Sequence, residues 1–352
     1  MSKKANILFT IPNFKTAGSQ FVLLSIYKML NRDFFQPFVL VEKFPEIFPE
    51  MIPENERLFI EQEGSNLKSI KSLSKLLRNK KIDILHSWDY KSNSIEALAC
   101  RKTGVKYIYT KKNNAWSKRW RIKSFLSHHI AYNNPEMLSR FFSNTLLKRK
   151  TSFVPHGVDT DVFKHKIEKI SGNHFVIGCV GNVNDNKNQL FVIKALAKLP
   201  LNVHFEVYGN EEVEYKKQLI HFIKEYSLAK RVTFHGFLEN NKMPSVLSSF
   251  DVLVLASKNE GLPLCLIEAM ACGVPILSSD SGGGARYIVG NNEGGFVYQN
   301  EAEFVEKVQE MVDNENGILK QLSEGGQRRV AEKFSLKEEV KMYQEIYRKL
   351  VN

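Results

Sequence analysis

The stretch N-E-G-L-P-L-C-L-I-E-A-M-A-C-G-V-P-I-L-S-S-D-S-G-G-G, residues 259–284, places two acids, Glu260 and Glu268, on either side of a Leu-Pro-Leu turn. An apolar run typical of a buried strand precedes it. Pro263 suits the first turn of a helix, where its missing N–H leaves no partner unsatisfied, and Gly273 suits the end of one. We therefore expect Glu260 in the loop before a helix and Glu268 inside that helix.

The start of such a helix favours a phosphate group, because its free N–H groups carry a partial positive charge. Two carboxylates would repel a diphosphate that they touched, so each is expected to accept hydrogen bonds from hydroxyl groups instead. A nucleotide sugar fits this arrangement, with its sugar on one glutamate and its ribose on the other. The alternative is that Glu260 is a solvated loop acid and Glu268 a surface acid of the helix.

Short apolar strands alternate with amphipathic helices along the rest of the chain, which predicts parallel sheets with helices on both faces. In the first half we expect strands at 6–11, 37–41, 82–87, 105–110, 128–132 and 151–155, and helices at 19–31, 67–80 and 91–102. In the second half we expect strands at 174–181, 202–209, 231–236, 251–257 and 274–279, helices at 189–199 and 213–228, and a helical stretch at 301–350.

These two halves predict two Rossmann-like, doubly wound α/β domains that face each other across a cleft. We place the first domain at 1–165, the second at 166–334, and a further helix at 335–352. In open parallel sheets, ligands bind beyond the carboxyl ends of the strands. Glycines at five such ends point to a phosphate-bearing ligand: Gly18, Gly181, Gly209, Gly236 and Gly261.

Basic side chains are concentrated in the first half of the chain. Residues 1–170 hold 30 Lys and Arg against 15 Asp and Glu, whereas residues 171–352 hold 20 against 23. A basic first half suggests an anionic partner such as nucleic acid, anionic lipid or a phosphorylated substrate. No apolar run reaches the ~18 residues of a membrane span. The four cysteines form no C-x-x-C pair, which favours a reducing cytoplasm: Cys100, Cys179, Cys265 and Cys272.

The segment E-G-L-P-L-C-L-I-E, followed by A-M-A-C-G-V-P-I-L-S-S-D-S-G-G, resembles the E-x7-E signature of the retaining glycosyltransferases of family 4, which have the GT-B fold. Four further segments resemble motifs of that family. They are A-G-S-Q at 17–20 (its glycine-rich loop), H-G-V-D-T-D-V-F at 156–163 (its N-G-V-D-x-x-x-F linker), G-N-V-N-D-N-K-N at 181–188 (its G-R-x4-K loop) and R-V-T-F-H-G-F-L-E-N at 231–240 (its V-x-F-x-G turn).

This resemblance implies that residues 1–165 form an N-terminal acceptor-binding domain, that residues 166–334 form a C-terminal nucleotide-sugar-binding domain, and that the helix at 335–352 packs back on the first domain. It also implies roles for individual residues. Glu260 would bind the donor sugar and Lys187 the diphosphate, and both are expected to be catalytic because the departing diphosphate must be stabilised. Glu268 would bind the ribose. The other donor contacts that the resemblance implies are Gly18, Gly181, Asn182, Gly236, Phe237, Gly261, Leu262 and Leu264.

Three positions depart from the family pattern and bear on donor type and activity. Asn182 replaces the arginine of G-R-x4-K, Lys111 and Lys112 follow a strand that usually leads to a histidine, and Arg286 replaces the acid of G-G-x-x-E. We expect Lys112 either to supply the second cation or to be a solvated loop lysine. His86, at the end of a first-half strand, is expected either to touch donor or acceptor or to be a packed structural histidine.

The resemblance implies transfer of a sugar, with retained stereochemistry, from a nucleotide sugar with an expected uridine base. The acceptor would be a hydroxyl group of a lipid-linked or glycan molecule in cell-surface polysaccharide or glycoconjugate synthesis. No metal, cofactor or nucleic acid is expected, and Asp159 in D-T-D is expected to be a turn acid. Two alternatives stay open: a non-catalytic protein of the same fold that binds nucleotide sugars or nucleic acid, and a nucleotide-sugar epimerase.

The segment T-K-K-N-N-A-W-S-K-R-W-R-I-K-S-F-L-S-H-H, residues 110–129, interleaves basic and aromatic side chains. Tryptophans suit a lipid interface, and basic groups near an anionic leaflet contribute about 1 kcal/mol each. We expect a cytoplasmic, peripheral protein that docks here on the inner face of the membrane. The alternatives are a helix that packs its aromatics inward and cations that hold an anionic acceptor. The residues concerned are Trp116, Lys118, Arg119, Trp120, Arg121 and Lys123.

Overall fold

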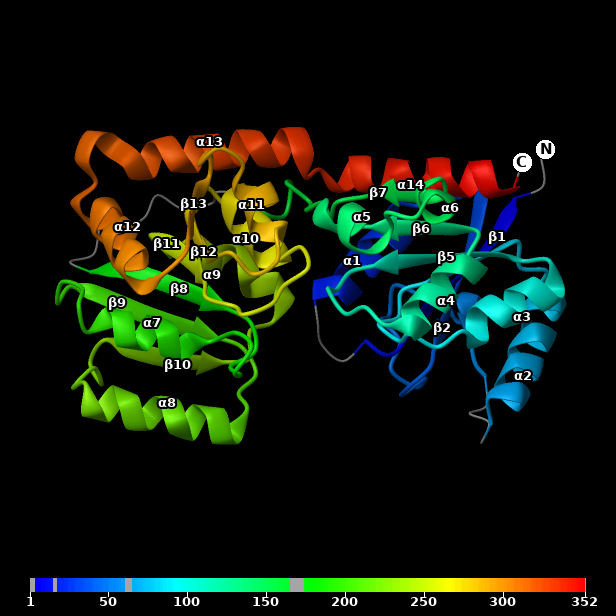
Figure 1. Cartoon of the computed structure of the whole chain (residues 1–352), viewed down its shortest axis with the longest axis horizontal. Coiled ribbons are helices and arrows are strands. Elements are labelled where there is room, and N and C mark those ends of the chain that lie inside the picture. The colour runs from blue at the N-terminus through cyan, green and yellow to red at the C-terminus, as the bar shows by residue number, and fades with distance from the viewer. Residues whose placement is uncertain (1–3, 15–17, 61–64, 165–173, 352) are drawn as a thin grey trace. The chain divides into compact units, whose positions relative to one another are not determined.

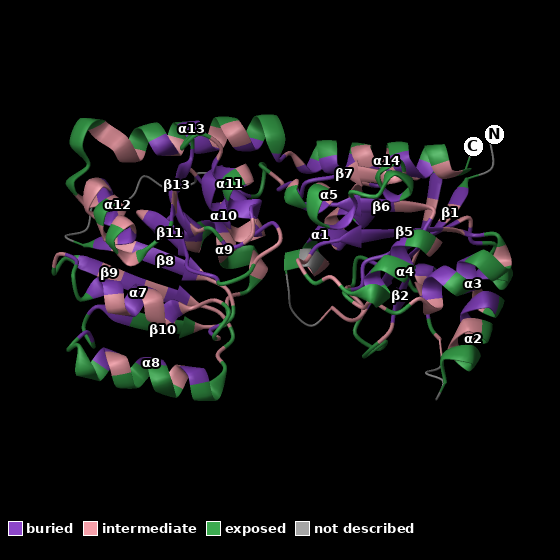
Figure 2. Ribbon diagram, viewed as in Figure 1, coloured by how far each residue is buried: buried purple, intermediate pink, exposed green. Residues whose placement is uncertain are grey.

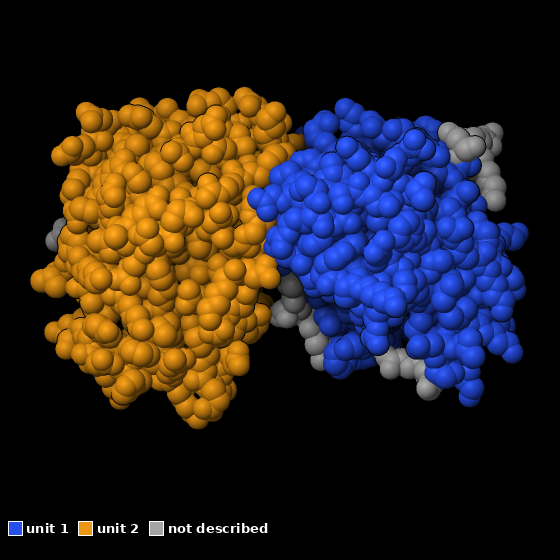
Figure 3. All heavy atoms as spheres, in the orientation of Figure 1, with its two compact units in different colours: residues 1–156, 336–352 blue, residues 157–335 orange. Residues whose placement is uncertain are grey.

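The computed structural model describes residues 4–14, 18–60, 65–164 and 174–351 of the chain (Figure 1). It divides into two compact units, coloured separately in Figure 3. Unit 1 comprises Met1–His156 and Leu336–Asn352, and unit 2 comprises Gly157–Ser335. The domain boundary expected at 165/166 and the Ala17 position of the A-G-S-Q segment lie outside the described residues.

Unit 1 contains a parallel sheet in the strand order β3-β2-β1-β4-β5-β6-β7. Its strands are β1 (Ala5–Ile11), β2 (Phe35–Val41), β3 (Arg57–Leu58), β4 (Ile84–Ser87), β5 (Lys106–Lys111), β6 (His129–Tyr132) and β7 (Thr151–Phe153). Its helices are α1 (Gly18–Met29), η1 (Glu54–Glu56), α2 (Asn66–Asn79), α3 (Ile95–Thr103), α4 (Lys118–Leu126), α5 (Glu136–Phe141), α6 (Thr145–Lys148) and α14 (Leu336–Val351).

Local chemistry sets several of these boundaries. The hydroxyl groups of Ser65 and Ser117 accept main-chain N–H groups of the first turns of α2 and α4, which satisfies donors that a helix start leaves unpaired. Gly104, with φ of 78°, ends α3 in the left-handed conformation that glycine adopts without strain. Every residue of β4 is buried, as expected for a central strand of a sheet that is covered on both faces.

Helices cover both faces of the unit 1 sheet. On one face α2 packs against α3 and α3 against α4, while on the other α1 packs against α14, which also contacts β4. The strand order reverses between β1 and β4, because β2 and β3 lie beyond β1 and β5, β6 and β7 lie beyond β4. The loops after β1 and β4 therefore flank the place where sheets of this type bind ligands.

Unit 2 contains a second parallel sheet in the order β10-β9-β8-β11-β12-β13. Its strands are β8 (Phe175–Val180), β9 (Val203–Tyr208), β10 (Val232–Gly236), β11 (Val252–Leu255), β12 (Ile276–Ser279) and β13 (Gly295–Tyr298). Its helices are α7 (Gln189–Leu196), α8 (Val213–Glu225), η2 (Asn240–Lys242), α9 (Met243–Leu247), α10 (Leu264–Ala271), α11 (Gly284–Val289), α12 (Glu301–Asp313), η3 (Glu315–Gly317) and α13 (Ile318–Lys333).

Two apolar cores hold the layers of unit 2 together. One lies between the sheet and α7, α8 and α12, and the other between the sheet and α9, α10, α11 and α13. Figure 2 shows the buried residues concentrated along the strands and on the inward sides of the helices. The strand order reverses between β8 and β11, so the loops after these two strands flank the ligand-binding edge of this sheet.

The expected fold class is confirmed, and each strand expected from the sequence overlaps a strand of the structure. Several short elements were not expected, because two to six residues are too few to show a period: β3, β13, α5, α6, α9, α11 and the 3-10 helices η1, η2 and η3. The helical stretch at 301–350 is interrupted twice. Asn314, with φ of 48°, ends α12, and α13 ends before Phe334, so that α14 belongs to unit 1.

Candidate functional site

The two loops at the switch point of unit 2 carry Lys187 and Glu260. The backbone and side-chain oxygens of Asn184 accept the N–H of Lys187 at 3.1 and 3.0 Å, which fixes the first loop. The N–H of Lys258 donates to the carbonyl of Asn186 at 2.8 Å, which joins the two loops. As a result, Nζ of Lys187 lies 2.8 Å from Oε1 of Glu260. The two residues that the sequence put forward as catalytic are thus in contact.

This ion pair is largely shielded from solvent, with side-chain exposures of 20% for Lys187 and 18% for Glu260. Burial alone would lower the pKa of Lys187, but the adjacent Glu260 carboxylate outweighs burial, and the pKa is raised above its usual 10.5. Lys187 is therefore a permanent cation at neutral pH. A fixed cation at the carboxyl edge of a parallel sheet suits a phosphate-bearing ligand.

Glycines let the backbone of these loops approach closely. A Cβ on Gly209 would lie 2.0 Å from the carbonyl oxygen of Gly181, and a Cβ on Gly284 would lie 1.9 Å from that of Gly261. Gly181 itself has φ of 143°, and a Cβ there would lie 3.1 Å from Cε of Lys187. The loop that carries Glu260 therefore packs directly on the start of α11, and the side chain of Lys187 lies across the turn after β8.

Glu268 is the fifth residue of α10, which begins at Leu264 rather than at the expected Pro263. Pro263 precedes the helix with an extended conformation, φ of −73° and ψ of 105°. Burial raises the pKa of the Glu268 carboxyl from 4.5 to about 7. Across the described ranges, no side chain or backbone donor bonds to this carboxylate. An acid held in a shielded place without a protein donor is a candidate acceptor for ligand hydroxyl groups.

The other donor contacts expected in unit 2 lie on the same two loops (Gly181, Asn182, Gly261 and Leu262), at the start of α10 (Leu264) or at the carboxyl end of β10 (Gly236 and Phe237). Phe237 is 60% exposed, and Asn182 is exposed while its carbonyl accepts Nε2 of Gln189 at 3.1 Å. Gly18 is the first residue of α1 in unit 1. The structure thus brings the unit 2 residues together at one edge of its sheet.

His86 is buried inside unit 1, and of its two expected roles the packed structural histidine is the one the structure bears out. Its Nδ1 lies 2.6 Å from the hydroxyl of Tyr347 on α14, and its Nε2 lies 2.8 Å from the hydroxyl of Thr110. Burial and the charge of Lys112 lower the pKa of His86 well below 6.5, so it stays neutral. Its hydrogen bonds hold the C-terminal helix on the sheet of unit 1.

Lys112, unlike His86, fits neither of its two expected roles. It is not a solvated loop lysine, and it is not available as a second cation for the phosphates. Its Nζ donates to the carbonyl of Trp88 at 2.6 Å and lies over the rings of Trp88 and Tyr90, at 4.5 and 4.3 Å from their centroids. Burial lowers its pKa well below 10.5. Neighbouring Lys111 is buried as well, with Nζ 2.6 Å from the carbonyl oxygen of Ala115.

The expected membrane segment is only partly exposed. Trp120 and Lys123 are 4% and 1% exposed, so neither can touch a lipid surface in this structure. Trp116 is half-buried and stacks on Phe141 with centroids 4.8 Å apart. The physical reason is the helical period, since Trp120 and Lys123 share the inward face of α4. The exposed basic residues of the segment are Lys118, Arg119 and Arg121.

Other observations complete the site. Asp159 is confirmed as a turn acid, since its Oδ1 accepts the N–H of Asp161 at 3.0 Å. Arg286 on α11 pairs with Asp280, which lies in the loop after β12, and Nε of Arg286 is 2.8 Å from Oδ2 of Asp280.

Gly284 was not among the site residues expected from the sequence, where only its place in a run of three glycines signalled it. In the described parts of the chain, no helix is long and apolar enough to cross a bilayer, and no three His, Cys, Asp or Glu residues are grouped as metal ligands.

Two family models match this chain. The model of "Glycosyl transferases group 1" matches residues 161–329, and that of "Glycosyltransferase Family 4" matches residues 16–162. The chain is 25% identical over 318 residues to UDP-Gal:alpha-D-GlcNAc-diphosphoundecaprenol alpha-1,3-galactosyltransferase of Escherichia coli, covering 80% of this chain and 79% of that protein. It is 28% identical over 217 residues to N-acetylgalactosamine-N,N'-diacetylbacillosaminyl-diphospho-undecaprenol 4-alpha-N-acetylgalactosaminyltransferase of Campylobacter jejuni, covering 60% of this chain and 54% of that protein.

Among solved structures, Anabaena Alr3699/HepE in complex with UDP and glucose superimposes with a TM-score of 0.81 at 20% identity, over 96% of this chain and 98% of that one. This likeness supports the fold, a pair of Rossmann-like units of the GT-B type. The two family models together follow nearly the whole chain, in line with the motifs of the sequence. The chain therefore belongs to the glycosyltransferases of family 4.

Proposed function

We propose that this glycosyltransferase moves a hexose from a UDP-linked donor, with retained stereochemistry and without a metal, to a hydroxyl group of a lipid-linked glycan. The observation that supports this most strongly is the contact of Lys187 with Glu260 at the edge of the unit 2 sheet that also carries Glu268, whose carboxylate accepts no hydrogen bond from the residues that the structure describes. The names of two relatives support the acceptor class, because both act on diphosphoundecaprenol-linked sugars. The UDP of one relative's donor and of the HepE complex supports the uridine nucleotide.

The proposed chemistry assigns one task to each residue. The bond between the anomeric carbon and the β-phosphate oxygen breaks, and the acceptor oxygen forms the new bond on the same face of the sugar. The acceptor proton passes to the departing diphosphate, whose charge Lys187 and the N–H groups at the start of α10 stabilise. Glu260 orients the sugar hydroxyls, and Glu268 accepts from the ribose. Because Lys187 and the N–H groups at the start of α10 offset the diphosphate charge, this scheme uses no divalent metal.

Release of the sugar from the nucleotide tests the activity without knowledge of the acceptor. We expect slow hydrolysis of at least one UDP-hexose by the wild type and a much lower rate in Glu260→Ala. Binding of a nucleotide sugar with neither hydrolysis nor transfer would favour the non-catalytic alternative. Conversion of the bound hexose into an epimer would favour the epimerase.

Attachment to an anionic membrane is the second part of the proposal. On the exposed side of α4, Lys118, Arg119 and Arg121 lie beside Ile122 and Phe125, which are 47% and 37% exposed. Basic groups near an anionic leaflet contribute about 1 kcal/mol each, and exposed apolar side chains add to a reversible attachment. This surface lacks the two buried residues Trp120 and Lys123, so the attachment rests on three cations.

Sedimentation with vesicles across a salt series tests this attachment. We expect wild-type protein to pellet with phosphatidylserine-containing vesicles at low salt and to stay in solution with neutral ones. The variant with Lys118, Arg119 and Arg121 changed to glutamate should stay in solution with both. A reversed-charge variant that still pelleted with anionic vesicles would exclude this face of α4 as the contact.

A further inference from the structure

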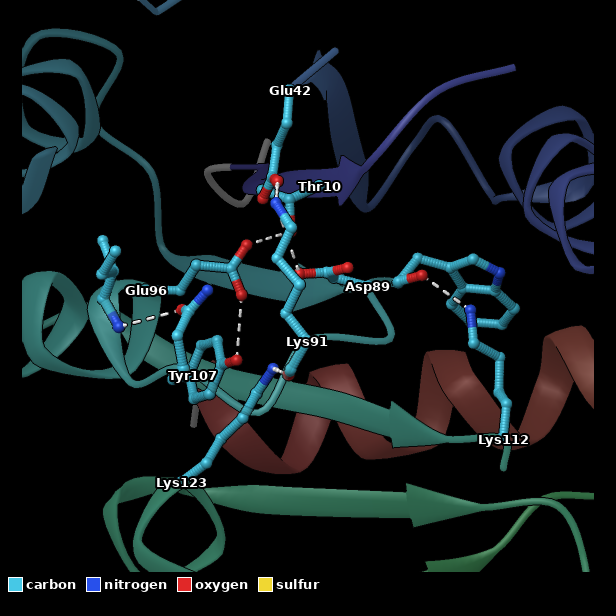
Figure 4. Close-up of polar contacts among 11 residues, drawn as sticks. Thr10, Glu42, Asp89, Lys91, Glu96, Tyr107, Lys112 and Lys123 are labelled. Carbon is cyan, nitrogen blue, oxygen red and sulfur yellow. Dashed lines mark hydrogen bonds and ion pairs between the residues drawn. The ribbon is translucent and has the colours of Figure 1, made fainter. Parts of the chain in front are cut away.

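The loop after β4, residues 88–94, lies at the switch point of the unit 1 sheet, yet the proposed donor chemistry does not use it. Open parallel sheets bind ligands at this place, outside the carboxyl ends of the strands. The side chains around the loop come from the ends of neighbouring strands. Thr10 lies near the end of β1, Glu42 follows β2, and Lys112 follows β5. Figure 4 shows these groups converging on the loop.

Two buried lysines hold the backbone of this loop. Nζ of Lys112 donates to the carbonyl of Trp88 at 2.6 Å, and Nζ of Lys123 donates to the carbonyl of Lys91 at 2.8 Å (Figure 4). Lys123 also lies over the rings of Tyr109 and Trp120, with centroid distances of 5.3 and 5.2 Å. Each end of the short segment 88–91 is therefore fixed by an ammonium group that comes from another element.

Three carboxylates balance these cations. Glu96 accepts the hydroxyls of Thr10 and Tyr107 at 2.5 and 2.9 Å, and Glu42 pairs with Lys91. Asp89 is 3% exposed, and its Oδ2 lies 3.9 Å from Nζ of Lys91. Replacing buried charged groups by apolar residues of similar volume is often neutral or stabilising, so stability alone does not account for such a network. A buried network of hydrogen bonds and ion pairs makes the segment that it contacts rigid, and here that segment is residues 88–91.

The network holds an exposed aromatic ring. Trp88 and Asp89 are 0% and 3% exposed, whereas Tyr90 between the two anchored positions is 44% exposed. Nζ of Lys112 lies 4.3 Å from the centre of the Tyr90 ring and so packs against the ring. Lys91 and Glu42, with side chains 41% and 21% exposed, lie in the same cluster.

We propose that Tyr90 is a stacking platform for a sugar ring of the acceptor, with Glu42 and Lys91 as hydrogen-bonding partners of its hydroxyl groups and with Lys112 and Lys123 as positioning residues. The C–H groups on one face of a pyranose carry partial positive charge and pack against the negative face of an aromatic ring. A tyrosine suits this task because it offers a large contact area with little entropy to lose. This inference rests on the proposed function, since it names the acceptor side of the same reaction.

Saturation-transfer NMR of the full-length protein with methyl α-glycosides tests the platform without knowledge of the whole acceptor. The probes are the glycosides of glucose, galactose, mannose, N-acetylglucosamine and N-acetylgalactosamine. We expect at least one to receive saturation on its C–H face from the wild type and from Tyr90→Phe, and to lose roughly tenfold in affinity with Tyr90→Ala. Tyr226→Ala in unit 2 is the matched control, because Tyr226 is 41% exposed and should leave the signal unchanged.

Variants of Lys112 separate positioning from simple structural support. Lys112→Met should leave the melting temperature unchanged or higher and yet weaken the glycoside signal, whereas Lys112→Arg should retain it because the cation over the ring is kept. If Lys112→Met lowered the melting temperature and left the signal intact, Lys112 would not be a positioning residue.

A panel in which no glycoside showed a Tyr90-dependent signal would overturn the proposal. The donor assignment is checked separately by the thermal shift that UDP-sugars produce in the same preparations. If UDP-sugars failed to bind while the Tyr90-dependent signal persisted, the proposed donor site in unit 2 would be wrong. The proposed stacking of a sugar on Tyr90 would still be supported.

Discussion

Changing Glu268 to glutamine should stabilise the protein at neutral and alkaline pH while weakening nucleotide binding. In the folded protein, burial raises the pKa of this carboxyl from 4.5 to about 7. A raised pKa means that the folded state favours the neutral acid, so ionisation above pH 7 acts against folding. Glutamine keeps the shape of the side chain and removes the charge.

The magnitude follows from linkage between protonation and folding. A pKa of about 7 against 4.5 corresponds to at most about 3 kcal/mol, because each pKa unit is worth about 1.4 kcal/mol. This destabilisation is absent below pH 4.5, grows between pH 4.5 and 7 and is complete above pH 7. The glutamine variant should therefore gain up to about 3 kcal/mol in unfolding free energy at pH 8 and little at the acid end of the range.

Urea unfolding of both proteins at several pH values between 5 and 8, with calorimetric titration of UDP at pH 8, measures both effects. The wild type should also bind UDP less tightly as the pH falls below 7, because a protonated Glu268 accepts fewer hydrogen bonds from ribose. Glu324→Gln on α13, an exposed acid far along the sequence, is a control that should change neither quantity. A glutamine variant that was less stable than wild type at pH 8 would show that the Glu268 carboxylate does not destabilise the fold, and one that bound UDP equally well would show that Glu268 does not hold the ribose.

Three further outcomes test the site in unit 2. Lys187→Ala should lower kcat by a factor on the order of 10² or more, which is typical when one preorganised charge donor is lost. Near-normal turnover in steady-state kinetics would show that another group binds the diphosphate. Glu260→Ala should lower kcat with a smaller effect on UDP affinity, and the reverse pattern would exchange the roles of the two glutamates. Gly284→Ala should weaken UDP-sugar binding in calorimetry, because its Cβ would lie 1.9 Å from the carbonyl of Gly261. Gly317→Ala, which meets nothing within 4 Å, should leave binding unchanged.

The loop and helix around Glu260 and Glu268 could be predicted because their conformation depends on local backbone chemistry. Pro263 is compatible with the start of a helix and Gly273 with its end, and both effects act within a few residues. The strands before and after this helix are continuous apolar runs, which is typical of buried parallel strands. The contact of Lys187 with Glu260, 73 residues apart, was not predicted, because the family resemblance implied only that each residue binds a different part of the donor. The roles of these residues remain predictions.

The interior of unit 1 could not be predicted in the same way. Lysines are rarely buried, so Lys111, Lys112 and Lys123 looked like surface cations in the sequence. Their burial depends on partners from other elements, such as the carbonyl of Trp88 for Lys112, 24 residues away. The inward face of α4 could have been anticipated in part, because Trp120 and Lys123 are three residues apart and share one side of a helix.

All of the roles proposed for the unit 2 residues depend on release of a hexose from a nucleotide sugar with retained stereochemistry. Its most direct test is time-resolved proton NMR of UDP-galactose, UDP-glucose and UDP-N-acetylglucosamine with wild-type enzyme and with Glu260→Ala. We expect the free sugar to appear first as the α anomer, before mutarotation, and Glu260→Ala to release it far more slowly. First appearance of the β anomer would exclude retention, and equal rates in both proteins would exclude Glu260 from the reaction.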